Sequence, residues 1–185
     1  PAKAMNYMKS VQGQQLTDHL AKFGFTGAIN QVYGVIYAQL QRPDSANYYF
    51  DKALPFFESG NETNKLLFYH QLANFYKDVQ QNSKAVDYFI RVKEIGEKLG
   101  MMENVKDAAK QLDTLYTLNG NYKLANEYNG IYYMYKDSIE KLNKEKELTQ
   151  LEAADELQRQ ERVVKEKEES KRRRNNIQYL AITIG

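Results

Sequence analysis

The sequence Tyr33-Gly34-Val35-Ile36-Tyr37 contains a pattern that occurs twice more in the chain, and this repetition predicts the fold. The later copies are Leu72-Ala73-Asn74-Phe75-Tyr76 and Leu112-Asp113-Thr114-Leu115-Tyr116. An alanine follows the last tyrosine of each copy by nine residues, and aromatic residues come soon after it: Ala46 with Tyr49 and Phe50, Ala85 with Tyr88 and Phe89, and Ala125 with Tyr128. The tyrosines and alanines recur every 39 to 40 residues, a period typical of stacked helical repeats. We expect the three tyrosines that end the copies and the three alanines to be buried at equivalent places.

The composition favours helices throughout the chain. Its 185 residues include only ten glycines and three prolines, and no segment shows the sustained apolar and polar alternation of a half-buried strand. Hydrophobic residues make up 42% of the chain, and fifteen of them are tyrosines, whose rings suit a thin two-layer packing with the hydroxyl in water. We therefore expect an all-α protein.

The repeated pattern resembles the long-repeat branch of the tetratricopeptide repeat family. In that family the first helix of each pair carries a large residue, a small residue and a tyrosine, while the second helix carries an alanine and an aromatic residue. Gly34 and Ala73 hold the small position, and Asp113 departs from it. The resemblance covers residues 1–139 and implies a right-handed helical solenoid. It implies a partial repeat at 1–26, repeats at 27–65, 66–105 and 106–139, and turns at 41–45, 80–83 and 119–121.

The first residues are expected to belong to an incomplete repeat. Ala4 to Met8, together with Val11, are predicted to form the second helix of a pair, since Ala4 precedes Ala46 by 42 residues. We expect further repeats upstream of Pro1 in the parent protein.

The character of the sequence changes after Tyr135. Residues 136–174 hold twelve Lys or Arg and eleven Asp or Glu, without glycine or proline. This composition predicts one long helix, continuous with a last repeat helix that begins near Tyr122. Its apolar residues form an imperfect heptad-like stripe: Ile139, Leu142, Leu148, Leu151, Ala154, Leu157, Val163 and Val164. The helix is either a stalk that pairs with a second copy as a weak coiled coil, or an exposed charged rod.

The last eleven residues, 175–185, are interpreted as the start of a truncated transmembrane segment. A basic cluster and an interfacial tyrosine before an apolar run are typical of a membrane flank: Lys171, Arg172, Arg173, Arg174 and Tyr179. The apolar run is too short to span a bilayer by itself. The alternative is an apolar tail that docks on the helical repeats.

No pattern in the chain predicts catalysis, and we expect neither an enzyme nor a cofactor or metal site. The chain has no cysteine, no glycine-rich phosphate loop and no serine elbow, and its two histidines, His19 and His70, stand far apart. The net charge of +2 gives no signature of nucleic-acid binding.

The family resemblance places a binding groove on the first helix of each pair. The groove residues it implies are Gln31, Val35, Gln39, His70, Asn74, Lys77, Lys110, Thr114 and Thr117. Their amide and ammonium groups can hydrogen-bond an extended peptide or its carboxylate end. Asn74 and Lys110 match positions at which family members grip chaperone tails, whereas Gln31 stands where a lysine is expected. The alternative is a polar groove that binds only water.

The order of repeats, charged helix, basic flank and apolar run resembles bacterial membrane-anchored sensors and regulators. This resemblance implies a periplasmic sensing or scaffolding domain on the inner membrane that binds a protein or peptide and dimerises through its stalk. It also implies a cytoplasmic output, often a histidine kinase. A cytosolic tetratricopeptide adaptor without a membrane span is the alternative. The sequence does not identify the ligand.

Overall fold

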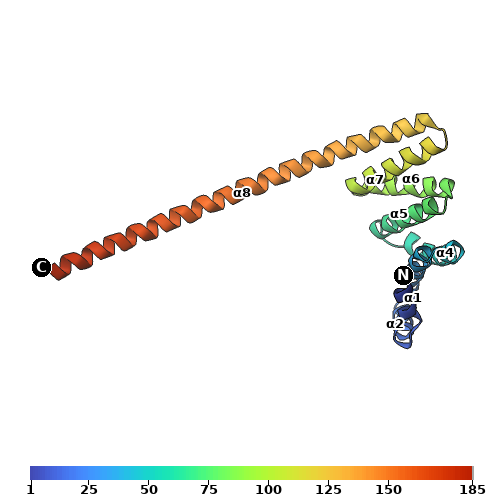
Figure 1. Ribbon diagram of the computed structural model, residues 1–185, viewed down its shortest axis with the longest axis horizontal. Coiled ribbons are helices and arrows are strands. Elements are labelled where there is room, and N and C mark those ends of the chain that lie inside the picture. Colours follow the sequence, from blue (N-terminus) through green and yellow to red (C-terminus); the bar gives the residue numbers. More distant parts are fainter. Residues whose placement is uncertain (185) are drawn as a thin grey trace. The chain divides into compact units, whose positions relative to one another are not determined.

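A computed structural model describes the backbone of residues 1–184 and the side chains of residues 1–177, and it is helical throughout this range (Figure 1). The all-α prediction is confirmed: eight helices and no strand occur in residues 1–184. The helices are α1 (Ala2–Lys9), α2 (Val11–Lys22), α3 (Thr26–Gln39), α4 (Pro43–Glu58), α5 (Glu62–Asp78), α6 (Asn82–Leu99), α7 (Met102–Leu118) and α8 (Tyr122–Ile184).

The chain divides after Lys136 into an N-terminal unit, residues 1–136, and a C-terminal unit that contains the rest of α8. In the N-terminal unit, turns of about three residues join consecutive helices that contact each other, so α3 packs on α4 and α5 packs on α6. Helix α7 packs on α6 in turn. The helix pairs are therefore built locally, each from neighbouring segments of the chain.

A continuous core runs through α4 to α7 and contains the first two repeated alanines, while the third alanine, Ala125, is buried on α8. Ala46 and Ala85 are fully buried, and Ala125 is 4% exposed. The small position on the first helix lets a large ring approach. A Cβ atom added to Gly34 would lie 2.5 Å from the ring of Phe50, and no side chain tolerates that distance without a shift of the ring.

At the positions equivalent to Gly34 and Phe50, the third copy of the pattern has polar residues. Asp113 stands where the first copy has Gly34, and Asn129 stands where it has Phe50. The Asn129 Nδ2 donates a hydrogen bond of 3.0 Å to Asp113 Oδ2. A polar pair has thus replaced a small residue and a ring, which explains why Asp113 is compatible with the repeat.

Every copy contains a stack of two tyrosine rings that are twelve residues apart in sequence, and in the first copy Tyr33 also stacks on Tyr49. The ring centroids of Tyr37 and Tyr49, Tyr76 and Tyr88, and Tyr116 and Tyr128 are 5.4, 5.7 and 5.5 Å apart, and their planes differ by 8° or 9°. We expected the first tyrosine of every pair to be buried. Only Tyr76 is, at 3% exposure, whereas Tyr37 and Tyr116 are half-buried at the edges of the core. Full burial therefore requires core on both sides.

The turn within each pair also repeats. Gln41, Gln80 and Gly120 adopt positive φ angles of 56°, 60° and 73°. The backbone N–H of the next residue donates to the carbonyl oxygen of the tyrosine five residues earlier, at 2.8 to 3.0 Å. The turns occupy residues 40–42, 79–81 and 119–121, because α4 already begins at Pro43 and α6 at Asn82. The first two turns are shorter than the predicted 41–45 and 80–83.

The N-terminal segment forms two helices, so the prediction of one helix from Ala4 to Val11 is wrong. Helix α1 ends at Lys9 because Ser10 takes an extended conformation and caps α2, with the Gly13 N–H donating to Ser10 Oγ at 3.1 Å. Gly13 then lies directly against the backbone of Tyr7, where an added Cβ would be 2.0 Å from the carbonyl oxygen.

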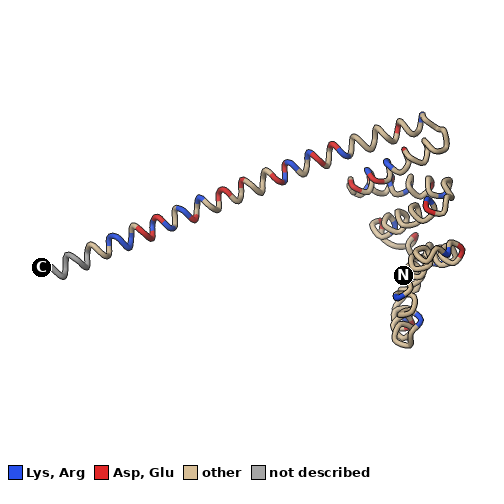
Figure 2. Tube along the Cα trace, viewed as in Figure 1, with Lys and Arg blue, Asp and Glu red and all other residues tan. Residues whose placement is uncertain are grey.

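The long charged helix is present as predicted, and α8 begins at Tyr122. Asn121 caps it by accepting a 3.3 Å hydrogen bond from the Leu124 N–H. Along the C-terminal unit, Lys and Arg alternate with Asp and Glu (Figure 2). In residues 1–184, no helix is both long and apolar enough to cross a membrane. Lys171 to Arg174 are exposed, and the side chain of Tyr179 lies outside the described residues.

Candidate functional site

The nine predicted groove residues lie on three helices, in sets of three. Helix α3 carries Gln31, Val35 and Gln39; helix α5 carries His70, Asn74 and Lys77; and helix α7 carries Lys110, Thr114 and Thr117. The α7 residues and Gln39 are exposed, and the other five are half-buried.

Two hydrogen bonds between side chains join these helices. The Gln31 Nε2 donates to Gln71 Oε1 at 2.7 Å, which connects α3 to α5. The Lys77 Nζ donates to Gln111 Oε1 at 3.1 Å, which connects α5 to α7. The first helices of the three pairs therefore lie next to one another, and their polar residues form a surface that we call the inner polar surface.

Gln71 and Gln111 belong to this surface but were missing from the predicted set. Gln31, Gln71 and Gln111 are spaced by 40 residues each, so the repeat period itself marks them in the sequence. The prediction did not include them because it was based on the positions implied by the family resemblance and not on the spacing of the glutamines.

The two residues expected to grip a peptide are already engaged within the protein. The Asn74 Nδ2 donates to the His70 carbonyl oxygen at 3.0 Å. The Lys110 Nζ lies 3.2 Å from Asp113 Oδ2 and 5.2 Å from the centroid of the Tyr132 ring. A ligand that binds Asn74 and Lys110 must therefore share or displace these contacts, which reduces what such a clamp contributes to affinity.

His70 is held in its neutral form. Burial lowers the pKa of its imidazole, the Asp107 carboxylate opposes this by raising it, and the Lys77 cation lowers it further. The imidazole ring lies edge-on to Phe89, with centroids 6.1 Å apart. At neutral pH His70 thus offers this surface one donor and one acceptor without a charge.

The described residues contain no cluster of three or more His, Asp or Glu placed to hold a metal ion. Within the same part of the chain, every buried side-chain nitrogen and oxygen has a hydrogen-bond partner. The buried polar side-chain atoms there are thus already hydrogen-bonded within the protein. A ligand would therefore bind to the exposed and half-buried groups described above.

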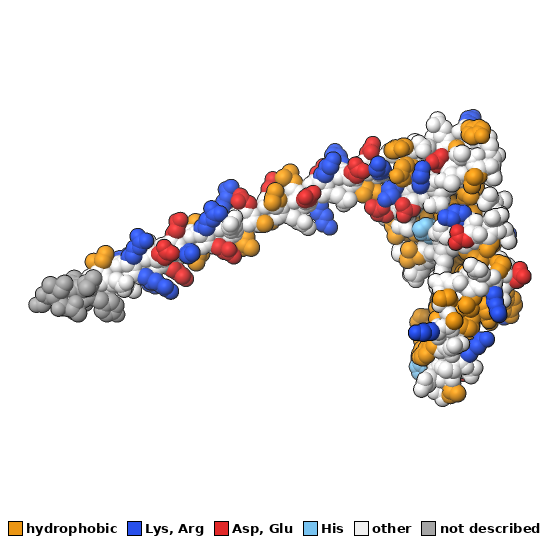
Figure 3. All heavy atoms as spheres, viewed as in Figure 1, with side chains coloured by type: hydrophobic (Ala, Val, Ile, Leu, Met, Phe, Trp, Pro, Cys, Tyr) orange, Lys and Arg blue, Asp and Glu red, His pale blue; other side chains and the backbone are white. Residues whose placement is uncertain are grey.

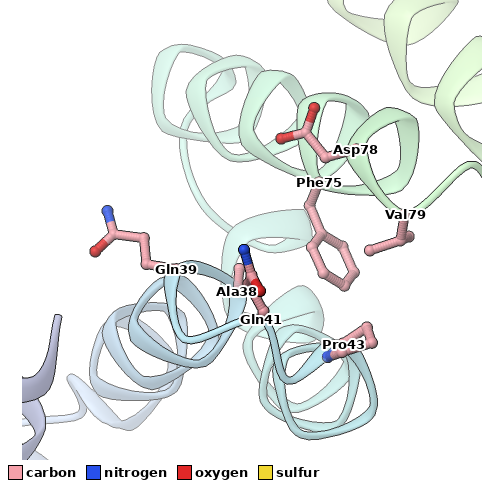
Figure 4. Close-up of a pocket in the computed structure, with 7 residues that line it drawn as sticks. All are labelled: Ala38, Gln39, Gln41, Pro43, Phe75, Asp78 and Val79. Atoms are coloured by element: carbon pink, nitrogen blue, oxygen red, sulfur yellow. The ribbon is translucent and has the colours of Figure 1, made fainter.

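Two hollows adjoin the first helices. One, of about 200 Å³, lies at the ends of α3 and α5 and is lined by Ala38, Gln39, Gln41, Pro43, Phe75, Asp78 and Val79 (Figure 4). The other, of about 300 Å³, is lined almost wholly by apolar residues of α1, α2 and α3 and their connections, among them Met8, Leu20, Ile29 and Val32. Of the nine predicted groove residues, Gln39 is the one that lines either of these two hollows.

The C-terminal unit exposes its apolar side chains singly between charged ones (Figure 3). Its charges also form ion pairs along the helix, such as Arg159 with Asp155 at 2.8 Å. Ile139 is half-buried, and the exposures of seven other apolar residues range from 48% to 67%: Leu142, Leu148, Leu151, Leu157, Val163, Val164 and Ile177. Ion pairs between neighbouring turns support a helix of this kind in water, at a few tenths of a kcal/mol each.

Comparison with protein-family models and with curated proteins gave no match for this chain.

Proposed function

We propose that residues 1–136 form a protein-binding domain of the tetratricopeptide type, arranged as a right-handed helical solenoid. This proposal is based on the inner polar surface, in which hydrogen bonds from Gln31 to Gln71 and from Lys77 to Gln111 connect the side chains of three helices. Such a surface presents amide and ammonium groups at one position per repeat. An extended polypeptide offers backbone donors and acceptors at regular intervals, and is the ligand that this arrangement fits best.

The wider role that we propose is that of a sensing or scaffolding module in a bacterial membrane-anchored signalling protein, on the periplasmic side of the inner membrane. The exposed cluster Lys171 to Arg174 supports only the membrane attachment in this proposal, because adjacent cations on a helix are attracted to anionic lipid headgroups. In this proposal α8 is the stalk that carries a displacement of the N-terminal unit toward the membrane, paired with the stalk of a second copy.

Photo-crosslinking tests the binding surface directly. We would place a photoreactive amino acid at Thr114, which is exposed on α7, and in a matched protein at Asp87, which is exposed on α6. Irradiation in cells of the native host should give discrete adducts from Thr114 only. The double substitution Asn74→Ala and Lys110→Ala should then weaken these adducts while the circular dichroism spectrum stays unchanged. Equal adducts from both positions, or none from Thr114, would rule out the inner polar surface as the binding site.

A further inference from the structure

The hollow between α3 and α5, which we call the turn cleft, is formed by the ends of two helices and one turn. Helix α3 ends at Gln39 and helix α5 at Asp78, and the turn before α4 supplies Gln41 and Pro43 (Figure 4). A wider hollow of about 620 Å³ continues from the same residues and includes Gln80. The turn cleft thus opens from a small inner space toward solvent.

The inner space has a fixed apolar floor. Phe75 is 7% exposed, and its ring lies 5.1 Å from the ring of Phe50 and 5.2 Å from that of Tyr76. Figure 4 shows the Phe75 ring directed between the α3 end and Pro43. Because core rings hold Phe75 from behind, the floor is formed before any ligand arrives.

The rim of the turn cleft carries one carboxylate. Asp78 is the only charged residue that lines either hollow. Its carboxylate makes no ion pair and no side-chain hydrogen bond in residues 1–184. Two helices also end here, and the C-terminal end of a helix carries partial negative charge. Two cations are close in sequence to the lining residues: Lys77, whose ammonium group is bound to Gln111 on α7, and Arg42, which is exposed in the turn between Gln41 and Pro43 and does not itself line the hollows.

Two glutamines that line the cleft lower the stability of the fold, because their backbone conformation is unfavourable for residues other than glycine. Gln41 and Gln80 occupy left-handed backbone positions, which side chains other than glycine disfavour. The equivalent residue of the third copy is Gly120, with φ of 73°, so the turn itself needs no side chain. Gln41 lines both hollows and Gln80 lines the wider one, and the amide group of a glutamine includes a carbonyl oxygen that can accept a hydrogen bond from a cation.

We propose that the turn cleft binds a lysine or arginine side chain of a partner polypeptide. The alkyl stem lies on Phe75 and Pro43, while the cation meets Asp78 and the carbonyl oxygens of the glutamines. Long cationic side chains suit such a site because their stems are apolar and their heads form charge-assisted hydrogen bonds. The inner volume of about 200 Å³ lies below the range of small-molecule sites and fits one side chain. This site does not depend on the inner polar surface.

Nuclear magnetic resonance of the ¹⁵N-labelled chain tests the proposal with two matched probes. N-acetyl-arginine methylamide carries the cation, and N-acetyl-citrulline methylamide has nearly the same shape without the charge. The arginine probe should give saturable shifts, with a Kd of about 1–10 mM, at the amides of residues 38–42 and 75–80. The citrulline probe should give none. Added salt should weaken the binding, because the attraction is between charges near the surface.

Substitutions distinguish binding of the arginine probe at this site from its non-specific attraction to acidic residues elsewhere. Asp78→Asn should weaken arginine binding about tenfold, since it removes a charged hydrogen-bond partner, and Asp18→Asn, an exposed carboxylate on α2, should change nothing. The double variant Gln41→Gly and Gln80→Gly should bind more weakly although it melts at a higher temperature. The proposal is overturned if citrulline binds as well as arginine, if Asp78→Asn binds normally, or if the shifts fall elsewhere or are absent.

Discussion

Replacing Tyr76 tests whether the repeat pattern identifies the core. Its side chain is 3% exposed, its ring stacks on Tyr88, and its hydroxyl donates a 2.8 Å hydrogen bond to Asn47 Oδ1. Tyr76→Phe keeps the ring and loses this one bond, which is worth about 1 kcal/mol. Tyr76→Ala also loses the ring and leaves a cavity, at about 3–5 kcal/mol. For a unit of this size, about 4 °C in Tm corresponds to 1 kcal/mol, so we expect losses of about 4 °C and 12–20 °C.

The assay must report the N-terminal unit alone, because α8 continues far outside it and dominates any helix signal. Fourteen of the fifteen tyrosines lie in residues 1–136, and the chain has no tryptophan. Near-ultraviolet circular dichroism of the tyrosines therefore follows the melting of that unit. Tyr133→Ala is the control, since this side chain is 52% exposed and its loss should cost less than about 1 kcal/mol. Equal Tm values for Tyr76→Ala and Tyr133→Ala would refute the reasoning.

Four further outcomes are expected. Gln80→Gly should raise the free energy of unfolding by about 1 kcal/mol in urea titrations, because it relieves the left-handed backbone, and Gly120→Ala should lower it by a similar amount. Burial raises the pKa of Tyr76 from 10.0 to about 12. The folded state thus favours the protonated hydroxyl, and stability that is complete below pH 10 should be lost toward pH 12, less steeply in Tyr76→Phe. Gly34→Ala should destabilise by about 1–3 kcal/mol, since the ring that it meets is fixed in the core; an unchanged urea midpoint would contradict this packing. If the stalk pairs, the isolated chain should sediment as a monomer or weak dimer, and cysteines on the stripe should cross-link between copies of the membrane-anchored protein at Leu142, Leu148 and Leu157.

The sequence predicted those features that depend on local residues and spacing. The all-helical fold, the buried alanines and the start of α8 at Tyr122 all follow from composition, from period and from the break signal at Asn119 to Asn121. The break after Lys9 was missed because a single serine cap decides it, inside a segment whose apolar residues continue to Val11. The half-burial of Tyr37 and Tyr116 was missed because their position in the stack, which no local pattern records, sets how much core covers them.

The candidate site was predicted less completely than the fold. The residues expected on the first helices do lie there, and bonds to Gln71 and Gln111 join their helices. Sequence reasoning treated Asn74 and Lys110 as free groups, whereas each has a partner inside the protein. Whether a polar side chain is available to a ligand depends on its neighbours across helices and one turn away, and the rotamers that settle this are not encoded in spacing.

Where α3 and α4 are joined by the contact of Gly34 with the Phe50 ring, α7 and α8 are joined by a hydrogen bond between Asp113 and Asn129. A closely packed ring holds two helices together because it buries apolar surface. This hydrophobic stabilisation depends little on salt and becomes weaker on cooling. The partly buried hydrogen bond between the Asp113 carboxylate and the Asn129 amide, with the Lys110 cation beside it, depends on charge and is weakened by added ions. The first four turns of α8 can therefore separate from α7 at a lower free energy than α4 from α3. Amide hydrogen exchange in residues 122–136 should accelerate with ionic strength, while exchange in α3 to α6 should not.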